Sequence, residues 1–528
     1  MTNFIKRRKI ILLLILITFI GGFLRFYQFS DLLRFNADQA RDASVIDQMM
    51  DKNEFPLLGP KAGGTTFKLG PAFYYLEYIS AFLFGHNPAG MAFFIPLLAT
   101  LSIPLFFLFL RYYFSPPLSL FLSFLYATSF YAIKYSRFAW NPNVIPFFIL
   151  LFLIAILKIA GKRERKDFVW PVILGIALGI GIQLHTILLF LMPALVATAF
   201  IFLYFKKQNK ILAKLLYVFT IAIVLNLPFL ISDIKNNGNN INSFFKGAEK
   251  KTEADGTIVK NILAEGQFFV QGNFYVLSSY EPQKNWLKVK KLVSSGASKE
   301  IIAAFSGSLF FLFGLIRLIL SFQKEKEEKR KKFLGLVLLS FAFSFVLFLP
   351  LASELNLRFF IVLVFLPFIF LGLLINFFSR FLDKKTVYLA MALVALVSAF
   401  FNLKTYKNVY DLENYNGKSD IYGGISLKEA RDISQFIHDF SQKKNEKTGK
   451  KLYLYPFEFS RSVNYLNKRA GVNISVLSGE KLDKNSILFM VIKSKNAKDA
   501  ETENECCYLT LASKNLGRFT VLALEGKN

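Results

Sequence analysis

The chain has 528 residues, of which 54% are hydrophobic and only 19% are charged, and its mean hydropathy is +0.41. A soluble protein usually has roughly 25% charged residues, so a soluble multidomain enzyme is disfavoured and a membrane protein is predicted. The formal net charge is +28, and the placement of the cations decides between nucleic-acid binding and membrane topology. Cys506 and Cys507 are adjacent, so an unstrained disulfide between them is not expected. The 3 histidines make a His-based metal site improbable.

About eleven apolar runs of approximately bilayer length follow one another along the chain. They cover residues 10–24, 88–110, 118–134, 144–160, 169–184, 187–205, 211–230, 302–320, 333–350, 359–378 and 386–402. The first run follows four basic residues and is not followed by a cleavage site of small residues, so we expect an uncleaved anchor with a cytoplasmic N-terminus. The segment 71–85 is short and rich in tyrosine, and we predict a helix along the membrane surface there.

When 71–85 is left out of the count, the short basic loops all fall on the N-terminal side of the membrane. They carry Arg111, then Lys162, Arg163, Arg165 and Lys166, then Lys206, Lys207 and Lys210, then the stretch from Lys324 to Lys332, then Arg380, Lys384 and Lys385. This distribution follows the positive-inside rule and explains much of the basic excess without nucleic acid. We therefore predict a multi-pass protein of the cell (plasma or inner) membrane that binds no nucleic acid.

The topology predicts an all-α membrane domain over residues 1–402, with outer loops at 25–87 and 231–300. Residues 403–528 are predicted to form a small extracytoplasmic α/β domain. Its strand-length apolar runs lie at 451–455, 472–477, 486–492 and 520–525, and its helical patterns lie at 427–440 and 460–469. The tract QKEKEEKRKK is interpreted as a solvated inner loop.

Charged residues close to apolar spans are costly and therefore informative. The middles of the predicted spans are nearly free of Asp, Glu, Lys and Arg, which argues against a proton- or ion-coupled transporter. Polar residues collect instead at the outer ends of the spans, and one outward-facing pocket would account for them. They are Asp38, Gln39, Arg41, Asp42, Lys68, Arg137, Trp140, Asn141, Gln183, His185, Asn226, Asp233, Glu354, Asn356 and Arg358.

The first outer loop holds the densest of these signals. Asp38 and Asp42 are four residues apart and would share a helix face, where two carboxylates either bind a cation or leave one of them with a raised pKa. Alternatively, Asp38 caps the following helix while Gln39 and Arg41 are solvated, and both interpretations fit the local sequence. No Asp-x-Asp pair occurs in the loop, so no cofactor is predicted and a divalent metal lacks the motif that would support it.

Two cations at outer positions each have a structural and a functional interpretation. Lys68 precedes Gly70 and an aromatic helix that includes Tyr74, and it either snorkels to lipid headgroups or meets a phosphate. Arg358 directly precedes an apolar span on the outer side, against the inside bias of short-loop cations. This placement predicts an anionic partner for Arg358, which is either Glu354 or a ligand.

Three further candidates have ordinary structural roles as alternatives. Arg137 and Asn141 flank an aromatic stretch at an outer helix junction, where an interface tryptophan and a solvated arginine are equally acceptable. A lone histidine such as His185 at a helix end is more often a hydrogen-bonded interface residue than a catalyst.

Four short motifs, in order and on one membrane face, resemble those of the GT-C membrane glycosyltransferases. The resemblance is to the protein O-mannosyltransferase and lipid A aminoarabinose transferase-like group (glycosyltransferase family 39-like), and it covers roughly residues 10–402. The motifs are Asp38-Gln39, the segment from Lys68 to Tyr75, the segment from Arg137 to Asn141, and Arg358-Phe359-Phe360. Gln39 and Asn141 stand where the group usually has Glu and Asp, which leaves Asp38 as the strongest catalytic candidate.

The resemblance implies transfer of a sugar from a polyprenyl-phosphate donor to an acceptor protein, lipid or cell-envelope glycan on the outer face. It implies that Asp38 takes the proton of the acceptor hydroxyl while this attacks C1 with inversion. The implied phosphate-binding residues are Lys68, Arg358, Arg137 and His185. The implied supporting residues are Gln39, Arg41, Asp42, Asn141, Tyr74 and Glu354. The spans would line a groove for the lipid in the bilayer, and the outer tail would help to select the acceptor.

Three alternatives follow from the same sequence. An oligosaccharyltransferase of this fold would be expected to keep metal-binding carboxylates that are not found. A lipid or polysaccharide transporter would need ionisable residues inside the spans or repeated halves. A non-catalytic scaffold of the GT-C type is kept open by Gln39 and Asn141, and such a scaffold should tolerate the change Asp38→Asn.

Overall fold

The structure is a computed structural model that describes residues 2–63, 65–161, 168–207, 210–252, 257–410, 424–445, 449–477, 485–494 and 508–526. Two sets of residues used in the sequence predictions lie outside these ranges. They are the basic loop residues Lys162, Arg163, Arg165 and Lys166, and the cysteines Cys506 and Cys507.

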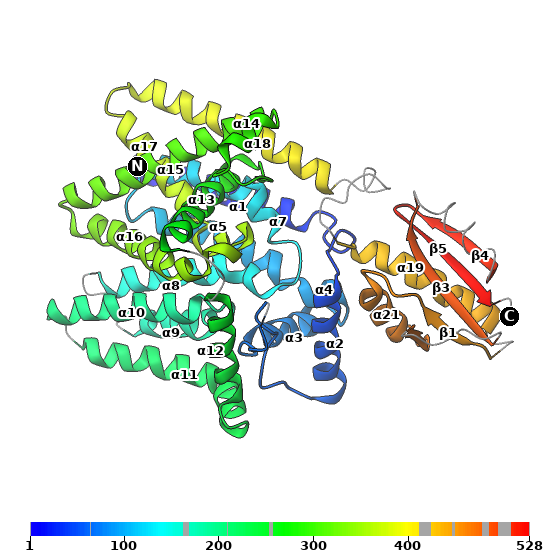
Figure 1. The fold of residues 1–528 in the computed structure, drawn as a ribbon. Helices are drawn as coiled ribbons and strands as arrows, with labels where there is room; N and C mark the ends of the chain where they lie inside the picture. The colour runs from blue at the N-terminus through cyan, green and yellow to red at the C-terminus, as the bar shows by residue number, and fades with distance from the viewer. Residues whose placement is uncertain are drawn as a thin grey trace.

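Long apolar helices build the first four hundred residues (Figure 1). Within the described ranges, 8 helices or helix pairs are long and apolar enough to cross a membrane. They are α1 (Thr2–Phe26), α4 with α5 (Pro88–Ala92 and Phe94–Leu110), η1 with α8 (Asn141–Val144 and Ile145–Ile159), α10 (Leu188–Phe205), α11 (Ile211–Lys235), α15 (Ser298–Lys324), α16 with η2 (Glu328–Phe348 and Leu349–Glu354) and α18 (Lys384–Tyr410). A ninth is the pair η3 (Leu357–Leu363) and α17 (Leu366–Phe378), which is bent by 60°. This confirms the predicted all-α, multi-span architecture.

Two of the eleven predicted spans form helices that are short for a bilayer. The run 118–134 is divided at Ser129 into α6 (Pro116–Thr128) and α7 (Phe130–Lys134), because Ser129 has a ψ of 120°. The run 169–184 forms α9 (Val169–Gly181), which is followed by turns. A helix of 13 residues rises about 20 Å, less than the roughly 30 Å of hydrocarbon. By length alone, α6 and α9 therefore do not count as spans.

The segment 71–85 forms α3 (Ala72–Phe84), a further short apolar helix. The predicted outer loop 231–300 is largely helical and contains α12 (Asn239–Thr252), α13 (Ile258–Ser278) and α14 (Val289–Ser294). Polar residues interrupt the apolar ones in these three helices, so none of them forms a continuous apolar run in the sequence. Their amphipathic pattern was the signal that could have revealed them.

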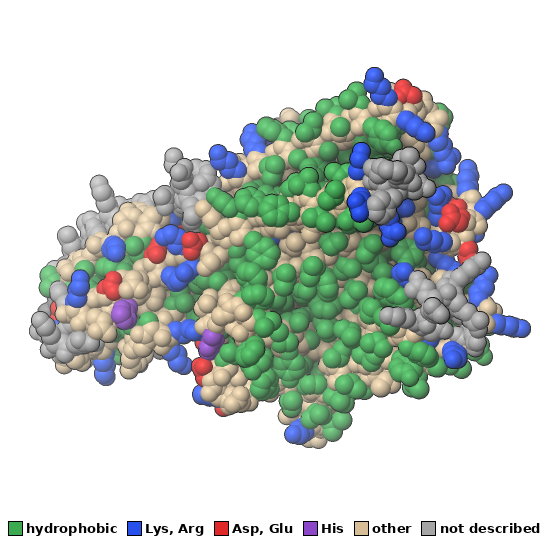
Figure 2. All heavy atoms as spheres, turned by 180° about the vertical axis from the view of Figure 1, so that it is seen from behind, with side chains coloured by type: hydrophobic (Ala, Val, Ile, Leu, Met, Phe, Trp, Pro, Cys, Tyr) green, Lys and Arg blue, Asp and Glu red, His purple; other side chains and the backbone are tan. Residues whose placement is uncertain are grey.

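The loops that were predicted to share the inner side meet at one end of the helical part. Lys332, near the start of α16, donates to the carbonyl of Ala160 after α8, and Lys329 lies over the ring of Tyr112 after α5. Figure 2 shows apolar side chains over the helical part and Lys and Arg gathered at the edge farthest from the sheet domain. Which end faces outward stays a prediction.

The C-terminal part forms a small α/β domain, as predicted. Its sheet has the order β2-β1-β3-β5-β4, with β1 parallel to β2 and β3, and β5 antiparallel to β3 and β4. The strands are β1 (Lys451–Leu454), β2 (Ile474–Val476), β3 (Ser486–Lys493), β4 (Tyr508–Leu516) and β5 (Phe519–Gly526). The helices α19 (Leu427–Phe440) and α21 (Ser460–Arg469) have the predicted bounds, whereas β4 was not predicted. The domain boundary at residue 402 stays a prediction, since α18 continues to Tyr410.

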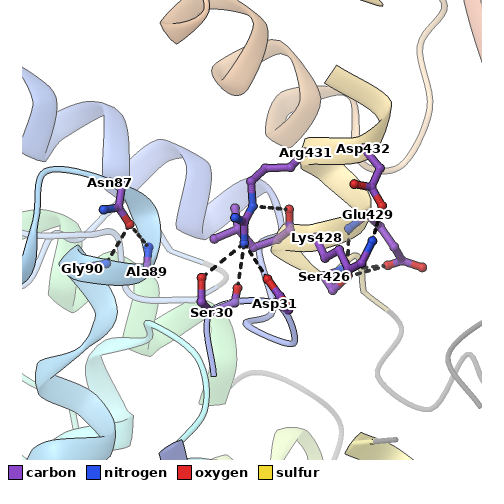
Figure 3. Close-up of polar contacts among 11 residues, drawn as sticks. Ser30, Asp31, Asn87, Ala89, Gly90, Ser426, Lys428, Glu429, Arg431 and Asp432 are labelled. Atoms are coloured by element: carbon purple, nitrogen blue, oxygen red, sulfur yellow. Dashed lines mark hydrogen bonds and ion pairs between the residues drawn. The ribbon is translucent and has the colours of Figure 1, made fainter. Parts of the chain in front are cut away.

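The sheet domain contacts the segment that leads into α2 (Ala37–Lys52). The N–H of Phe35 donates to the carbonyl of Ile425 (2.8 Å). Arg431 of α19 donates to the carboxylate of Asp31 (3.2 Å), as Figure 3 shows. The start of α2 is therefore held by the tail domain as well as by the helical part.

Candidate active site

The first turn of α2 is anchored by Gln39, a predicted supporting residue. Its Oε1 accepts from the N–H of Asn36 (3.1 Å), and its Nε2 donates to the carbonyl of Ala139 (2.7 Å). Gln39 is buried, so both ends of the amide are used inside the protein. A carboxylate at this position would lack the donor for Ala139. The amide therefore joins α2 to the link 134–143 and leaves the neighbouring Asp38 at the surface.

Arg41 bridges the two carboxylates that were predicted to share a face of α2. Its Nη1 lies 2.8 Å from Oδ1 of Asp38, and its Nη2 lies 2.8 Å from Oδ1 of Asp42. The side chain of Asp38 is 63% exposed, whereas that of Asp42 is 5% exposed. Only Asp38 is thus open to an incoming molecule, and Arg41 fixes its position.

A second buried acid, Glu77 of α3, lies behind Asp42. The hydroxyl of Tyr74 donates to Oδ1 of Asp42 (3.0 Å), while Oε2 of Glu77 has no hydrogen-bond partner in the described part of the chain. Burial raises the pKa of Asp42 to about 6, although the positive charge of Arg41 opposes this. Burial, with the nearby charge of Asp42, raises the pKa of Glu77 well above its ordinary value. Both carboxyl groups therefore keep a proton to higher pH than an exposed acid does.

No group of three or more His, Cys, Asp or Glu residues that could hold a metal ion occurs within the described ranges. The cation that lies beside Asp38 is the guanidinium of Arg41. Asp38 is thus an exposed carboxylate held by an arginine.

Three successive residues, the two that precede η1 and the first residue of η1, hold different parts of the site together. Ala139 accepts the hydrogen bond from α2 that is described above. The ring of Trp140 lies 5.3 Å from Cζ of Arg358 in η3, and Nδ2 of Asn141 donates to the carbonyl of Leu184 (2.7 Å). The start of α2, the start of η3 and the turn after α9 therefore converge on residues 139–141.

Arg358 is exposed and its guanidinium lies over two aromatic rings. Cζ is 5.3 Å from the ring centroid of Trp140 and 5.0 Å from that of Phe359. The ring of His185 packs against Phe359 (5.2 Å), so the structure brings His185 close to Arg358. No carboxylate of the described residues forms an ion pair with Arg358, and this includes Glu354, which was one of its two expected partners. The other expected partner, an anionic ligand, stays a prediction.

Lys68 is an exposed side chain on a tightly held backbone. Its N–H donates to Oδ1 of Asn240 and its carbonyl accepts from Nδ2 of Asn240, both at 2.9 Å. Two residues later, a Cβ at Gly70 would lie 2.2 Å from Oε1 of Gln183, which accepts from the N–H of Ala72 (3.0 Å). Glycine is needed here because the chain approaches Gln183 so closely, and Gln183 ties the Lys68 segment to the turn that carries His185.

Arg137 is separated from the exposed cations. It is 2% exposed, its Nη1 donates to the carbonyls of Leu24 and Arg25 (both 3.0 Å), and its Nη2 donates to the carbonyl of Tyr27 (2.7 Å). The guanidinium therefore satisfies the free carbonyls at the C-terminus of α1, where a cation is favoured. In this position Arg137 anchors the link 134–143 to α1. Arg137 is therefore not among the phosphate-binding residues of the proposed function.

Two contributors to the site were missed in the sequence. Glu77 had a signal, because it is the one acidic residue in the apolar stretch PAFYYLEYISAFLFG, and an ionisable residue in such a stretch is costly unless it has a role. Asn240 had no signal, because its partner Lys68 is distant in the sequence and asparagine is common in loops.

Comparisons with known proteins identify the fold. Residues 68–231 match the family model of dolichyl-phosphate-mannose-protein mannosyltransferases, and no curated protein sequence matches the chain. The structure of ArnT from Cupriavidus metallidurans bound to undecaprenyl phosphate matches with a TM-score of 0.56 and 11% identity, over 96% of this chain and 97% of that one. The oligosaccharyltransferase AglB from Archaeoglobus fulgidus, in complex with an inhibitory peptide and a dolichol-phosphate, matches with a TM-score of 0.51 and 13% identity, over 88% of this chain and 64% of that one.

These matches confirm the resemblance predicted from the sequence. At such low identity the matched structures show the GT-C fold, and the family model adds the segment that contains Lys68, Arg137 and His185. Together they show that the chain has the fold of GT-C membrane glycosyltransferases. The roles of individual residues stay predictions.

Proposed function

We propose, on the premise that this chain is a membrane glycosyltransferase of the GT-C fold, that it transfers one sugar from a polyprenyl-phosphate donor to an acceptor hydroxyl on the outer membrane face. The acceptor is a protein, a lipid or a glycan of the cell envelope. One observation carries the proposal. The exposed carboxylate of Asp38 and the exposed guanidinium of Arg358 are supported by neighbouring residues of one link, Ala139 through Gln39 and Trp140 directly. A base and a phosphate-binding cation are therefore held on a common support.

Asp38 is the proposed base. As the acceptor oxygen forms its bond to C1 of the sugar, the hydroxyl proton passes to the Asp38 carboxylate. The bond between C1 and the phosphate oxygen breaks, and its electron pair leaves with the polyprenyl phosphate. Attack from the face opposite the phosphate inverts the configuration at C1. A single carboxylate suffices because the phosphate leaves as an anion, which needs cations rather than a proton donor.

Lys68 and Arg358 are the proposed partners of the donor phosphate. Both side chains are exposed, and within the described ranges neither forms an ion pair with a carboxylate. The aromatic rings below Arg358 orient its guanidinium, which suits a planar group that binds phosphate with two parallel hydrogen bonds. His185 is the third proposed contact because it packs on the same Phe359.

The test compares membranes that contain the wild type, Asp38→Asn or Asp51→Asn, each supplied with labelled polyprenyl-phosphate sugars. Asp51 lies on the same helix and its side chain is 64% exposed, so it is a matched control. We expect the wild type and Asp51→Asn to transfer label, and Asp38→Asn to lose about 10²-fold or more of the rate, since that is the usual contribution of a general base. Mass spectrometry of lipids, glycans and proteins identifies the donor and the acceptor.

Two other outcomes separate the alternatives. Transfer at the wild-type rate by Asp38→Asn would remove the base assignment but keep the transferase. Binding of the carrier lipid without consumption of any sugar donor by the wild type would favour the non-catalytic scaffold or the transporter.

A further inference from the structure

We infer that Asn240 is a positioning residue that fixes Lys68 for the donor phosphate, an inference that rests on the proposed function. Asn240 lies in the first turn of α12, outside every predicted span. Its carboxamide pairs with both the N–H and the carbonyl of Lys68, at 2.9 Å each. A carboxamide that bonds both backbone groups of one residue takes the place of a neighbouring β-strand. It therefore fixes the backbone from which the Lys68 side chain projects.

The backbone groups of Lys68 need such a partner because of the hairpin in which they lie. Residues 59–62 pair with residues 67–69, since Ala62 N–H donates to Phe67 O (2.9 Å) and Leu69 N–H donates to Pro60 O (3.0 Å). In an antiparallel pair, alternate residues direct their N–H and carbonyl groups away from the partner strand. Lys68 is the residue between the two paired positions, so its polar groups lie on the free edge. Asn240 occupies that edge.

The same face of α12 holds the rest of this segment. Phe244, one turn after Asn240, packs on Phe67 with ring centroids 5.2 Å apart. A Cβ at Gly247 would lie 2.9 Å from Cγ2 of Thr65, so the helix and the segment approach closely there as well. Positions 240, 244 and 247 share one helix face, and their partners at 68, 67 and 65 follow in the opposite direction. The helix therefore contacts the segment at three points, and Asn240 is the polar one.

Asp233 fixes Asn240 in turn. It is 6% exposed, and its Oδ1 accepts from the N–H groups of Asn240 (3.0 Å) and Ile241 (3.1 Å). A carboxylate at the N-terminus of a helix is favoured by the unpaired N–H groups and by the helix dipole. Asp233 belongs to the last turns of α11, so Lys68 is connected to that helix through Asn240.

The long, flexible side chain of Lys68 explains why this support matters for function. The ammonium group of a lysine stands on a flexible stem of four carbons and binds phosphate as a point charge. Its position therefore depends on where the backbone is held. Lys68 forms no ion pair with any carboxylate of the described residues. Loss of Asn240 should therefore change the affinity for phosphate rather than the affinity for the lipid chain.

The experiment measures binding of polyprenyl phosphate and of the corresponding polyprenol, which lacks the phosphate, to the purified full-length protein. We expect Asn240→Ala to weaken binding of polyprenyl phosphate about fivefold to tenfold, consistent with the loss of two ordinary hydrogen bonds, and to leave polyprenol binding unchanged. The control is Asn242→Ala, an exposed asparagine of the same helix, which should behave as the wild type. In a Lys68→Ala background, Asn240→Ala should have almost no further effect.

Equal weakening of both lipids, or an undiminished effect of Asn240→Ala without Lys68, would mean general destabilisation and would overturn the inference. Hydrogen exchange at the Lys68 amide gives a readout that does not depend on the proposed function. Asn240→Ala should make this amide exchange faster, whereas unchanged exchange would contradict the inference. A wild type that binds polyprenyl phosphate no better than polyprenol would overturn the proposed function instead, while the exchange result would still decide whether Asn240 holds Lys68.

Discussion

The side-chain amide of Gln39 contributes to the stability of the site through a single atom. Its Nε2 donates to the carbonyl of Ala139, and a glutamate there would place a charged oxygen against that carbonyl. We expect Gln39→Glu to lower the free energy of unfolding by about 1–3 kcal/mol, the usual cost of a buried group that loses its partner. Thermal unfolding in detergent measures the change. Gln48→Glu, at an exposed position of the same helix, is the control and should leave the melting temperature unchanged.

The buried pair of Asp42 and Glu77 predicts a particular pH dependence. An acid whose pKa is raised by folding binds its proton more tightly in the folded state, so its contribution to stability is present at low pH. That contribution is lost as the pH rises from the ordinary pKa, about 4, to the folded value, about 6 for Asp42. For Glu77 the loss also begins at the ordinary pKa, and it continues to higher pH because the folded pKa is raised well above the ordinary value.

Glu77→Gln keeps the shape of the side chain and removes its ionisation. We therefore expect the variant to come closest to the wild type near pH 4, about the ordinary pKa, and to become more stable than it as the pH rises toward 9. Melting temperatures across this range measure the difference. A variant that is less stable by the same amount at every pH would show that Glu77 stabilises the fold through packing.

The helix α21 contacts the second half of α2, whose first turn carries Asp38. Nη1 of Arg469 lies 2.6 Å from Oδ1 of Asp47, and Nη2 donates to the carbonyl of His86 (2.7 Å). Arg469→Ala should allow α2 to move relative to the link 134–143. Because exposed ion pairs contribute up to about 1 kcal/mol, we expect about a fivefold lower kcat with unchanged donor binding. Arg461→Ala, an exposed arginine of α21, is the control, and an equal loss in both variants would contradict this role.

Elements with local signals were predicted well, whereas elements that depend on distant contacts were not. The predicted helical pattern at 427–440 matches the bounds of α19, and in the structure Ser426 and Glu429 form a capping box at its start. The strand β4 was missed because none of its residues is buried and its sequence, YLTLASKNL, has no continuous apolar run. The spacing of Asp38 and Asp42 placed them on one face, while the burial of Asp42 depends on Tyr74 in another helix.

The same reasoning explains the cations of the site. Arg137 and Arg358 look alike in the sequence, because each adjoins an aromatic residue at the outer end of a helix. Their partners differ. Arg137 bonds to carbonyls of α1 more than one hundred residues away, whereas Arg358 lies over the rings of Trp140 and Phe359. No local sequence pattern reveals the distant partners of Arg137.

Contacts across the whole molecule bear on whether the short helix α6 crosses the membrane. Tyr112, before α6, lies under Lys329 at the end where the basic loops meet. Arg137, after α7, bonds to the C-terminus of α1, which is the opposite end of that helix from the N-terminus. The pair α6 and α7 therefore runs from one end to the other, and its combined rise of about 28 Å is close to the hydrocarbon thickness.

The helix α9 is bounded in the same way. Asn141, before α8, bonds to Leu184, after α9, whereas Ala160, between the two helices, contacts Lys332 at the end where the basic loops meet. If α8 crosses, α9 must return across the membrane. With both short helices included, the crossings number the eleven that the sequence predicts, and an odd number places the first outer loop and the tail on one side.

Cysteine labelling tests this topology in a background in which Cys506 and Cys507 are changed to serine. The direct contact of Arg431 with Asp31 requires the tail and the segment before α2 to share a side. We therefore expect Lys52→Cys and Ser475→Cys, both at exposed positions, to react with a membrane-impermeant maleimide in intact cells. Lys326→Cys, in the basic connection between α15 and α16, should react only after permeabilisation, because short basic loops stay inside.

Each departure from that pattern has its own meaning. Different responses of Lys52→Cys and Ser475→Cys would contradict the docking of the tail domain on the α2 segment. Reaction of Lys326→Cys in intact cells together with the other two would mean that one of α6 and α9 does not cross and that the bent pair η3 and α17 does not cross either. Complete reversal of the pattern would leave the contacts intact and reverse the orientation, and a polyprenyl-phosphate donor would then have to be used on the cytoplasmic face.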